Sequence, residues 1–213
     1  MKAVVVAHGE VDPSDVDHVR GADLVIAADG GSLHLQRWGI EPHVVVGDLD
    51  SLSSDARARL ESARVERWPA EKDKTDTELA VDCAIASGAD EIVIVGALGG
   101  PRLDHAMANT LLLALERRVD TRVRVVRGST SMRIIRAGER ADLMGRPGDL
   151  VTLLAVGGDA EGVRTEGLRY PLRSETLRLG SSRGVSNEVA AAGASVTLGS
   201  GTLLVIHSSQ GQG

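Results

Sequence analysis

The sequence predicts an α/β protein in which an N-terminal, Rossmann-like, mostly parallel sheet with helices is followed by a C-terminal all-β sandwich. In the first half, short runs of Val, Ile and Ala alternate with helical segments, and such runs are typical of strands buried on both faces of a parallel sheet. Beyond about Arg127 the helical periodicity fades, and short alternating runs separated by glycines follow, which indicates a small antiparallel sandwich or barrel. We therefore expect two domains, formed by residues 1–126 and 127–213.

The composition is that of an ordinary globular protein, with 42% hydrophobic and 25% charged residues in a chain of 213. Its formal net charge of −6 argues against a general nucleic-acid binder. Because there is no apolar run of transmembrane length, no evident signal peptide and a single cysteine, Cys83, we expect a cytoplasmic protein with no membrane association. Phe is absent and the only aromatic residues are Trp38, Trp68 and Tyr170, so we expect an aliphatic core and no base-stacking platform.

The first half of the chain alternates between predicted strands and helices. Thr75 and Glu78 have the spacing of a capping box, so one helix is expected to begin at Thr75. Gly39 and Gly88 follow two of the helices, as glycine commonly does at a helix C-terminus. The expected strands are residues 2–7, 23–28, 44–46, 65–68, 92–95 and 122–126, and the expected helices are residues 32–38, 53–63, 75–87 and 103–118.

The second half consists of short predicted strands with frequent turns between them. The polar, glycine-rich stretch 180–188 reads as a loop that ends in Ser186 and Asn187. The expected strands are residues 132–136, 140–143, 150–156, 160–166, 176–179, 195–198 and 202–207.

Two carboxylates follow the most hydrophobic central strand. The run 44–46 is all valine, and after Gly47 it delivers Asp48 and Asp50 to its C-terminal end. Carboxylates this close can converge on a hard cation, and Mg²⁺ held by one or two carboxylates and by substrate phosphates is usual in phosphoryl chemistry. The alternative is that Asp48 opens a turn and Asp50 or Ser51 caps the next helix.

Acidic residues recur where other predicted strands end. Asp29 follows the second strand and precedes Gly30 and Gly31, Asp76 lies beyond the fourth strand, and Asp104 lies beyond the fifth. The ends of parallel strands lie at one edge of the sheet, so these side chains are expected to converge there. Since such carboxylates repel one another unless cations are present, the pattern favours a Mg²⁺–nucleotide site.

Basic residues accompany these acids. Lys72 and Lys74 precede the predicted helix N-terminus at Thr75, where phosphates can bind, and the guanidinium of Arg102 can hold phosphate oxygens in a fork. The alternative is that the lysines are solvated and Asp76 favours the helix dipole. Asp104 can bind metal, orient Arg102 or cap its helix. P-loop, dinucleotide-binding and nucleophile-elbow motifs do not occur at the appropriate places.

Taken together and in order, five motifs resemble the thiamine pyrophosphokinase family. They are AADGG (27–31), VGDLDS (46–51), EKDKTDTELA (71–80), GALGGPRLDHAMAN (96–109), and YPL with GVSNE (170–188). The resemblance implies an α/β nucleotide-binding catalytic domain and a β-sandwich that binds thiamine and forms a homodimer. It also implies transfer of the diphosphate of ATP to the hydroxyl of thiamine, with Mg²⁺ as cofactor and AMP as second product.

The resemblance also implies roles for individual residues. Asp48, Asp50 and Asp76 match the acids that hold the metal, and with Arg102 they form the expected catalytic group. The residues expected to bind nucleotide or thiamine are Asp29, Gly30, Lys72, Thr75, Asp104, Ser186 and Asn187. Either Asp50 or Asp76 can accept the hydroxyl proton, although a primary alcohol can also lose it late without a dedicated base.

Two departures from the family pattern leave other functions open. Pro101 interrupts the glycine–glycine–arginine run and stiffens the loop before Arg102. Tyr170 is the only aromatic residue of the second half, so little is available to stack on the rings of thiamine. One alternative is a diphosphokinase for another heterocyclic alcohol, such as a pterin, and another is a non-catalytic ATP-binding sensor.

Overall fold

The computed structural model describes residues 1–48, 63–69, 71, 73–115 and 121–210. The chain divides into two compact units, Met1–Gly128 (unit 1) and Ser129–Gly213 (unit 2). The predicted helix 53–63 falls almost wholly outside the described residues, as do the predicted site residues Asp50 and Lys72. None of the described helices has the length and apolarity needed to span a bilayer.

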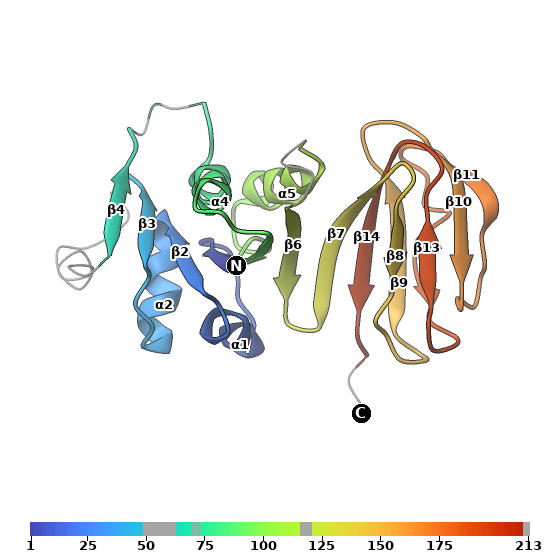
Figure 1. Cartoon of the computed structure of the whole chain (residues 1–213), viewed down its shortest axis with the longest axis horizontal. Helices are drawn as coiled ribbons and strands as arrows, with labels where there is room; N and C mark the ends of the chain where they lie inside the picture. The colour runs from blue at the N-terminus through green and yellow to red at the C-terminus, as the bar shows by residue number, and fades with distance from the viewer. Residues whose placement is uncertain (49–62, 70, 72, 116–120, 211–213) are drawn as a thin grey trace. The chain divides into compact units, whose positions relative to one another are not determined.

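Unit 1 is built on a parallel sheet, as predicted (Figure 1). Its strands stand in the order β6-β5-β1-β2-β3-β4, and every neighbouring pair is parallel. The strand order reverses between β1 and β5, and in open α/β sheets ligands bind outside the carboxyl ends of the strands at such a reversal. The strands are β1 Lys2–Val6, β2 Leu24–Ala28, β3 Val44–Gly47, β4 Arg64–Arg67, β5 Glu91–Val95 and β6 Arg122–Arg127.

The helices of unit 1 agree with the sequence in part. Helix α2 (Ser32–Trp38) has the predicted bounds and is followed by Gly39 at φ +67°, and α4 (Asp76–Ala86) is N-capped by Thr75 as predicted. Helix α5 (Leu103–Leu111) is shorter than expected, because a 3-10 turn, η3 (Leu112–Ala114), follows it. Other short helices are η1 (Pro13–Asp15) and α1 (Val16–Arg20), which were not predicted, and η2 (Asp29–Gly31).

Helices cover the sheet of unit 1 with aliphatic side chains. One cluster joins alternate residues of β1, β2, β3 and β5 to Val19 of α1 and Leu35 of α2, since side chains alternate between the faces of a strand. Helix α4 packs on β1, β2 and β3 with small and aliphatic residues, among them Cys83, which is 7% exposed. Cys83 is therefore a small residue of this packed core.

Glycines allow close backbone contacts at the carboxyl ends of three strands. A methyl group on Gly31 would lie 1.9 Å from the carbonyl oxygen of Val6, and one on Gly96 would lie 2.4 Å from that of Ala7. Gly9 donates its N–H to the carbonyl of Gly96 at 2.6 Å. The segments that follow β1, β2 and β5 are therefore held against one another by backbone atoms.

Unit 2 is the predicted antiparallel β-sandwich. One sheet has the order β12-β9-β14-β7 and the other β11-β10-β13-β8, and aliphatic residues of both sheets share one core. The strands are β7 Thr130–Arg136, β8 Arg140–Asp142, β9 Leu150–Ala155, β10 Ala160–Glu166, β11 Arg173–Leu177, β12 Asn187–Glu188, β13 Ser195–Thr197 and β14 Thr202–Ser208.

Two strands of unit 2 differ most from the prediction. Strand β11 begins at Arg173, before the expected start at 176, and it pairs with β10. Strand β12 lies within the stretch expected to be a loop, and Asn187 pairs there with Val151 of β9. The glycine-rich composition of that stretch concealed a short pairing with a distant strand.

We expect Gly31→Ala to lower the free energy of unfolding by about 1–3 kcal/mol, because the methyl group meets the backbone of β1 rather than a movable side chain. Chemical denaturation measures this change. Gly21→Ala is the matched control, because the nearest atoms would lie at 3.5 Å and 3.7 Å, and a change within about 0.5 kcal/mol is expected. Equal effects of the two substitutions would contradict the close contact at Gly31.

Candidate active site

Two of the acidic side chains predicted to converge, those of Asp29 and Asp76, lie together beside Gly47, the last residue of β3, whereas Asp104 is not among the residues found there. A methyl group on Gly47 would lie 3.0 Å from Cβ of Asp29 and 3.4 Å from Oδ1 of Asp76, so both side chains lie beside this glycine. Asp29 comes from the end of β2, and Asp76 from the first turn of α4. Asp48 directly follows Gly47 in the chain, so three of the predicted acids belong to this region.

Asp29 is held in an unusual state. Its φ is +43°, in the left-handed region that few residues other than glycine adopt. Its Oδ1 is buried, and no donor among the described residues reaches it. A buried carboxylate oxygen without a partner is costly, so this atom suits a cation or a ligand donor.

The fit to Mg²⁺ rests on this orphaned oxygen and on the carboxylates beside it. Mg²⁺ is usually bound by one or two carboxylates and keeps water and substrate phosphate oxygens as its other ligands. Within the described residues, no three acidic, His or Cys side chains form a group that could hold an ion by themselves. Asp50 lies outside the described residues, so its part in the site stays a prediction.

Arg102 and Asp104 pair with each other at the start of α5. Nε and Nη2 of Arg102 donate to the two carboxylate oxygens of Asp104 at 3.0 Å and 2.7 Å. Asp104 was expected to bind metal, to orient Arg102 or to cap its helix, and in the structure it orients Arg102. The hydrogen bond from Arg102 holds the pKa of Asp104 at about 2, and Asp104 in turn raises the pKa of Arg102.

A glycine-rich loop (residues 96–102) carries Arg102 away from β5. Gly96, Gly99 and Gly100 have φ values of +65°, +75° and +79°, which side chains with a Cβ rarely adopt. Buried Asn109 of α5 donates its Nδ2 to the carbonyl of Ala97 at 2.9 Å. The loop thus has a defined path, and Pro101 lies within it without a cis peptide bond.

Of the two lysines predicted near the start of α4, the structure describes Lys74, and its ammonium group pairs with acidic residues of that helix. Lys74 Nζ lies 2.7 Å from Asp82 and 3.5 Å from Glu78, and the hydrogen bond to Asp82 raises the pKa of Lys74. Thr75 accepts the N–H of Glu78 at 3.2 Å, so its hydroxyl caps α4. The binding role predicted for Thr75 stays a prediction beside this structural one.

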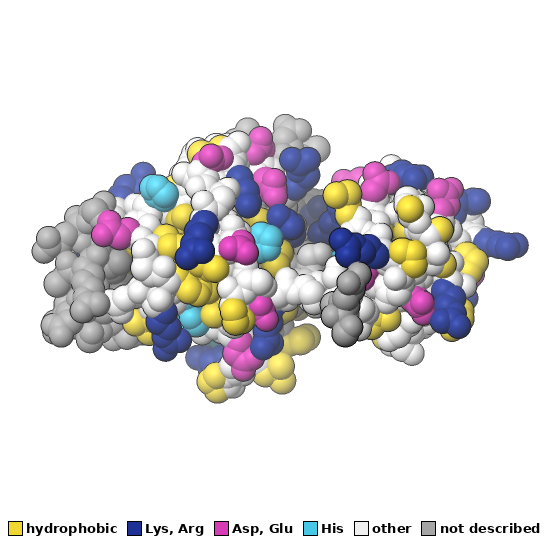
Figure 2. Space-filling model, turned by 90° about the horizontal axis from the view of Figure 1, so that it is seen from below, with side chains coloured by type: hydrophobic (Ala, Val, Ile, Leu, Met, Phe, Trp, Pro, Cys, Tyr) yellow, Lys and Arg dark blue, Asp and Glu magenta, His cyan; other side chains and the backbone are white. Residues whose placement is uncertain are grey.

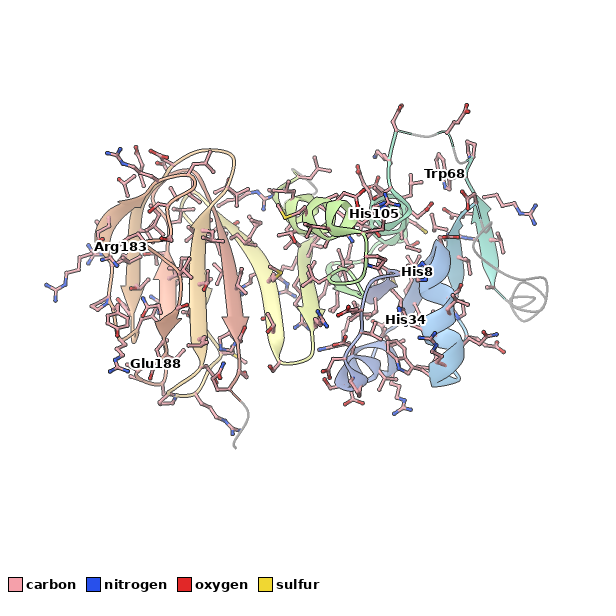
Figure 3. All side chains as sticks on the ribbon, turned by 180° about the vertical axis from the view of Figure 1, so that it is seen from behind. His8, His34, Trp68, His105, Arg183 and Glu188 are labelled. Atoms are coloured by element: carbon pink, nitrogen blue, oxygen red, sulfur yellow. The ribbon has the colours of Figure 1, made fainter. Side chains whose placement is uncertain are left out.

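Two histidines, His8 after β1 and His34 of α2, were not predicted to be part of a site. Their rings lie near one another, with centroids 6.3 Å apart (Figure 3). The His8 ring packs on Gly30, where a methyl group would lie 2.2 Å from its Nδ1, so the predicted binding residue Gly30 makes room for this ring. The signal available in the sequence was a histidine and a glycine directly after the first strand.

His34 supports the segment that follows β1. Its Nε2 bonds the carbonyl of Gly9 at 2.9 Å, and burial lowers the pKa of His34, which favours the neutral ring. Because a carbonyl accepts only from an N–H, Nε2 carries the proton. Nδ1 is then a buried acceptor without a donor among the described residues.

In unit 2, Asn187 fixes Tyr170 rather than facing outward. Its Oδ1 accepts the N–H groups of Tyr170 and Glu188 at 3.0 Å and 2.9 Å, and its Nδ2 donates to the carbonyl of Tyr170 at 2.7 Å. Asn187 is 6% exposed, whereas Tyr170 is 54% exposed, with the guanidinium of Arg169 5.8 Å from its ring centroid. The predicted binding role of Asn187 stays untested, and its visible contacts are to the backbone.

Ser186, Arg169 and Glu188 are chain neighbours of the hydrogen-bonded residues Asn187 and Tyr170. Ser186 is exposed, has φ +57°, and donates its backbone N–H to the hydroxyl of Thr152 at 3.1 Å. Arg169 and Glu188 form an ion pair at 2.9 Å. On the face shown in Figure 2, acidic and basic side chains are interspersed with apolar ones over each unit.

The fold and the site together define an α/β protein with an acidic site at the ends of its parallel strands, extended by a β-sandwich. Two family profiles match this arrangement in chain order. The first, described as the catalytic domain of thiamin pyrophosphokinase, matches residues 17–125, and the second, its vitamin B1 binding domain, matches residues 135–203. The chain belongs to the thiamin pyrophosphokinase family, and the resemblance inferred from the five motifs is confirmed.

Members of this family are similar to the chain in sequence and structure over most of its length. A thiamine pyrophosphokinase of Bacillus subtilis is 30% identical over 187 residues, which cover 87% of each chain. The crystal structure of thiamine pyrophosphokinase from Bacillus subtilis superposes with a TM-score of 0.88 at 27% identity, covering 99% of this chain and 100% of that one. The corresponding structure from Geobacillus thermodenitrificans gives 0.84 at 29% identity, covering 100% and 99%.

We expect the carboxyl group of Asp104 to titrate at about pH 2, below its ordinary value of 3.8, because its ionised form accepts from Arg102. Since the pKa is lowered in the folded state, the stabilisation is complete above about pH 4 and is lost as the pH falls towards 2. Carbon-detected NMR titration measures this pKa. Arg102→Gln is the control, and it should return the value towards 3.8. Titration of the unmodified protein near 3.8 would contradict the pairing.

We expect Asn187→Ala to lower the free energy of unfolding by about 1–3 kcal/mol, because it removes the partners of three hydrogen bonds at Tyr170 and Glu188. Denaturant unfolding measures the change. Ser186→Ala, one residue away on the exposed side, should stay within about 0.5 kcal/mol. If Asn187→Ala is as stable as the unmodified protein, the hydrogen bonds between Asn187 and Tyr170 are dispensable for folding.

Proposed function

We propose that this protein is a thiamine pyrophosphokinase that transfers the diphosphate of ATP to the hydroxyl of thiamine, giving thiamine diphosphate and AMP. The observation that supports it most directly is the placement of Asp29 and Asp76 together beside Gly47, with Oδ1 of Asp29 buried and without a partner among the described residues. That arrangement lies in the part of the chain that matches the family's catalytic domain. ATP and thiamine are accordingly the proposed small-molecule substrates.

We propose that Asp48 and Asp76, with Asp50, hold Mg²⁺, and that Asp29 helps to order the bound nucleotide beside them. A bound ion would neutralise phosphate charge at these carboxylates. The chain supplies carboxylates for it after β3 and at the start of α4, and Asp29 lies beside them after β2. Because Asp29 and Asp76 approach the same glycine from different elements, the sheet and α4 fix this site together.

The other role proposed for residues of unit 1 is to position the phosphates of ATP. The thiamine oxygen must attack the β-phosphorus in line, and no covalent enzyme intermediate is needed, so orientation and charge dominate catalysis. Arg102 presents a planar fork of donors that suits phosphate oxygens, at the end of a loop whose path is set by its glycines. Asp76 is a candidate acceptor for the hydroxyl proton, as is Asp50.

For thiamine, we propose a surface of unit 2 formed by Tyr170 and Ser186. Tyr170 offers an exposed ring, and Asn187 holds its backbone on both the N–H and the carbonyl side. In this proposal Asn187 acts through Tyr170 by fixing its position. This unit carries the match to the family's vitamin B1 binding domain. We further propose a homodimer, which sedimentation velocity tests directly.

We expect the purified protein, given ATP, Mg²⁺ and thiamine, to form thiamine diphosphate and AMP in equal amounts, measured by chromatography. Asp29→Asn and Asp76→Asn remove a negative charge with little change of shape, and each should lower kcat/KM by about 100-fold or more. Asp17→Asn, an exposed change on α1, is the control and should leave the rate unaltered. Rates equal to that of the control would place the reaction elsewhere.

The products distinguish the alternatives. The same assay is repeated with a panel of other heterocyclic alcohols, including a pterin. If AMP appears only with one of these, the acceptor is not thiamine, but the proposed roles of the unit 1 residues are retained. If ATP binds with Mg²⁺ and no alcohol in the panel yields AMP, the protein is a sensor. Chelation of Mg²⁺ should stop the reaction of the unmodified protein, and a rate independent of divalent cation would contradict the proposed metal site.

A further inference from the structure

Glu10 connects three strand ends on the two sides of the strand reversal. It follows β1, and its Oε1 accepts the N–H of Gly100, in the loop after β5, at 3.1 Å. Its Oε2 forms an ion pair with Nη2 of Arg127, the last residue of β6. One carboxylate thus joins segments that are 90 and 117 residues away in the chain.

The backbone and the packing around Glu10 reinforce this connection. The N–H of Glu10 donates to the carbonyl of Leu98 at 2.8 Å, and the two residues form an isolated antiparallel bridge. A methyl group on Gly99 would lie 2.7 Å from Oε2 of Glu10, so this glycine lets the loop pack against the carboxylate. Leu98, Gly99 and Gly100 therefore all meet the same residue.

The contact lies two residues before Arg102. Pro101, whose ring fixes φ, stands between Gly100 and Arg102, so the position of the Arg102 backbone depends on that of Gly100. The start of the loop has other supports, since Gly9 bonds Gly96 and Asn109 bonds Ala97. Glu10 holds the later part, from which Arg102 extends.

We propose that Glu10 is a positioning residue for diphosphate transfer, because its carboxylate holds the 96–102 loop and thereby places Arg102 against the phosphates of ATP. This inference rests on the proposed function. Its contribution to stability is small, since the side chains of Glu10 and Arg127 are 53% and 42% exposed and exposed ion pairs contribute little. The substrate affected is ATP, while thiamine binding is spared.

Four variants separate the two contacts of Glu10. Glu10→Ala removes both, Glu10→Gln keeps an oxygen that can accept from Gly100, and Arg127→Met removes the ion pair alone. The double variant Glu10→Lys with Arg127→Glu restores an ion pair of reversed sign, but lysine cannot accept the N–H of Gly100. Each is compared with the unmodified protein in kcat, in KM for ATP with Mg²⁺, in KM for thiamine and in Tm.

We expect Glu10→Ala to lower kcat/KM for ATP by about 10- to 100-fold, because a small displacement of a phosphate-binding group has effects of this size. KM for thiamine should change by less than about twofold, and Tm by no more than about 4 °C. Glu10→Gln and Arg127→Met should lose much less, and the double variant should stay as impaired as Glu10→Ala. Recovery in the double variant, or a Glu10→Ala rate within about twofold of the unmodified protein, would overturn the proposal.

Hydrogen exchange of the peptide that contains Gly100 supplies a readout without turnover. Its amide should exchange faster in Glu10→Ala and in the double variant than in Arg127→Met, and unchanged exchange would overturn the proposal. If the unmodified protein binds ATP but does not transfer diphosphate to thiamine, the proposed function fails by itself. In that case calorimetric binding of ATP with Mg²⁺ decides the role of Glu10, and equal affinities of Glu10→Ala and Arg127→Met would exclude it.

Discussion

The close approach of backbone segments at the carboxyl ends of β1, β2 and β5 is the constraint on which the site depends. Gly31 stands against the carbonyl of Val6, and Gly96 against that of Ala7, at distances that leave no room for a Cβ. Parallel pairing brings the strand ends to one edge, and these glycines bring the loops beyond them into contact. The acids after β2 and β3 and the loop after β5 consequently belong to one edge of the sheet.

Most of the fold could be predicted because its signals are local. Valine and isoleucine runs mark strands buried on both faces, and Thr75 with Gly39 marks where helices begin and end. The misses have physical causes. Helix α1 is too short for a periodic pattern, and it depends on Asp15, which is buried and binds the backbone of Asp12 and Gly128. Strand β12 exists through its pairing with a distant strand.

The site could be predicted only as far as sheet geometry orders it. The expectation that Asp29 and Asp76 lie close together agrees with their approach to Gly47, although Asp76 is placed by the start of α4 and not by a strand end. The roles of Asn187 and Glu10 depend on partners far away in the chain, which residue type and spacing do not reveal. A sequence does not distinguish an asparagine that binds a ligand from one that binds a backbone, so the hydrogen bonds between Asn187 and Tyr170 could not be predicted.

The charged groups of the site differ in how readily they can change partners. Arg102 is already paired with Asp104, and both side chains are 64% exposed, so phosphate oxygens can replace that carboxylate at little cost. Asp29 is the opposite case, since its Oδ1 is buried and lacks a partner among the described residues. In the proposed function, the anion-binding group Arg102 can therefore exchange partners, and its loop sets its position. The acidic part is fixed by the sheet and gains most when a positive charge or a donor is supplied.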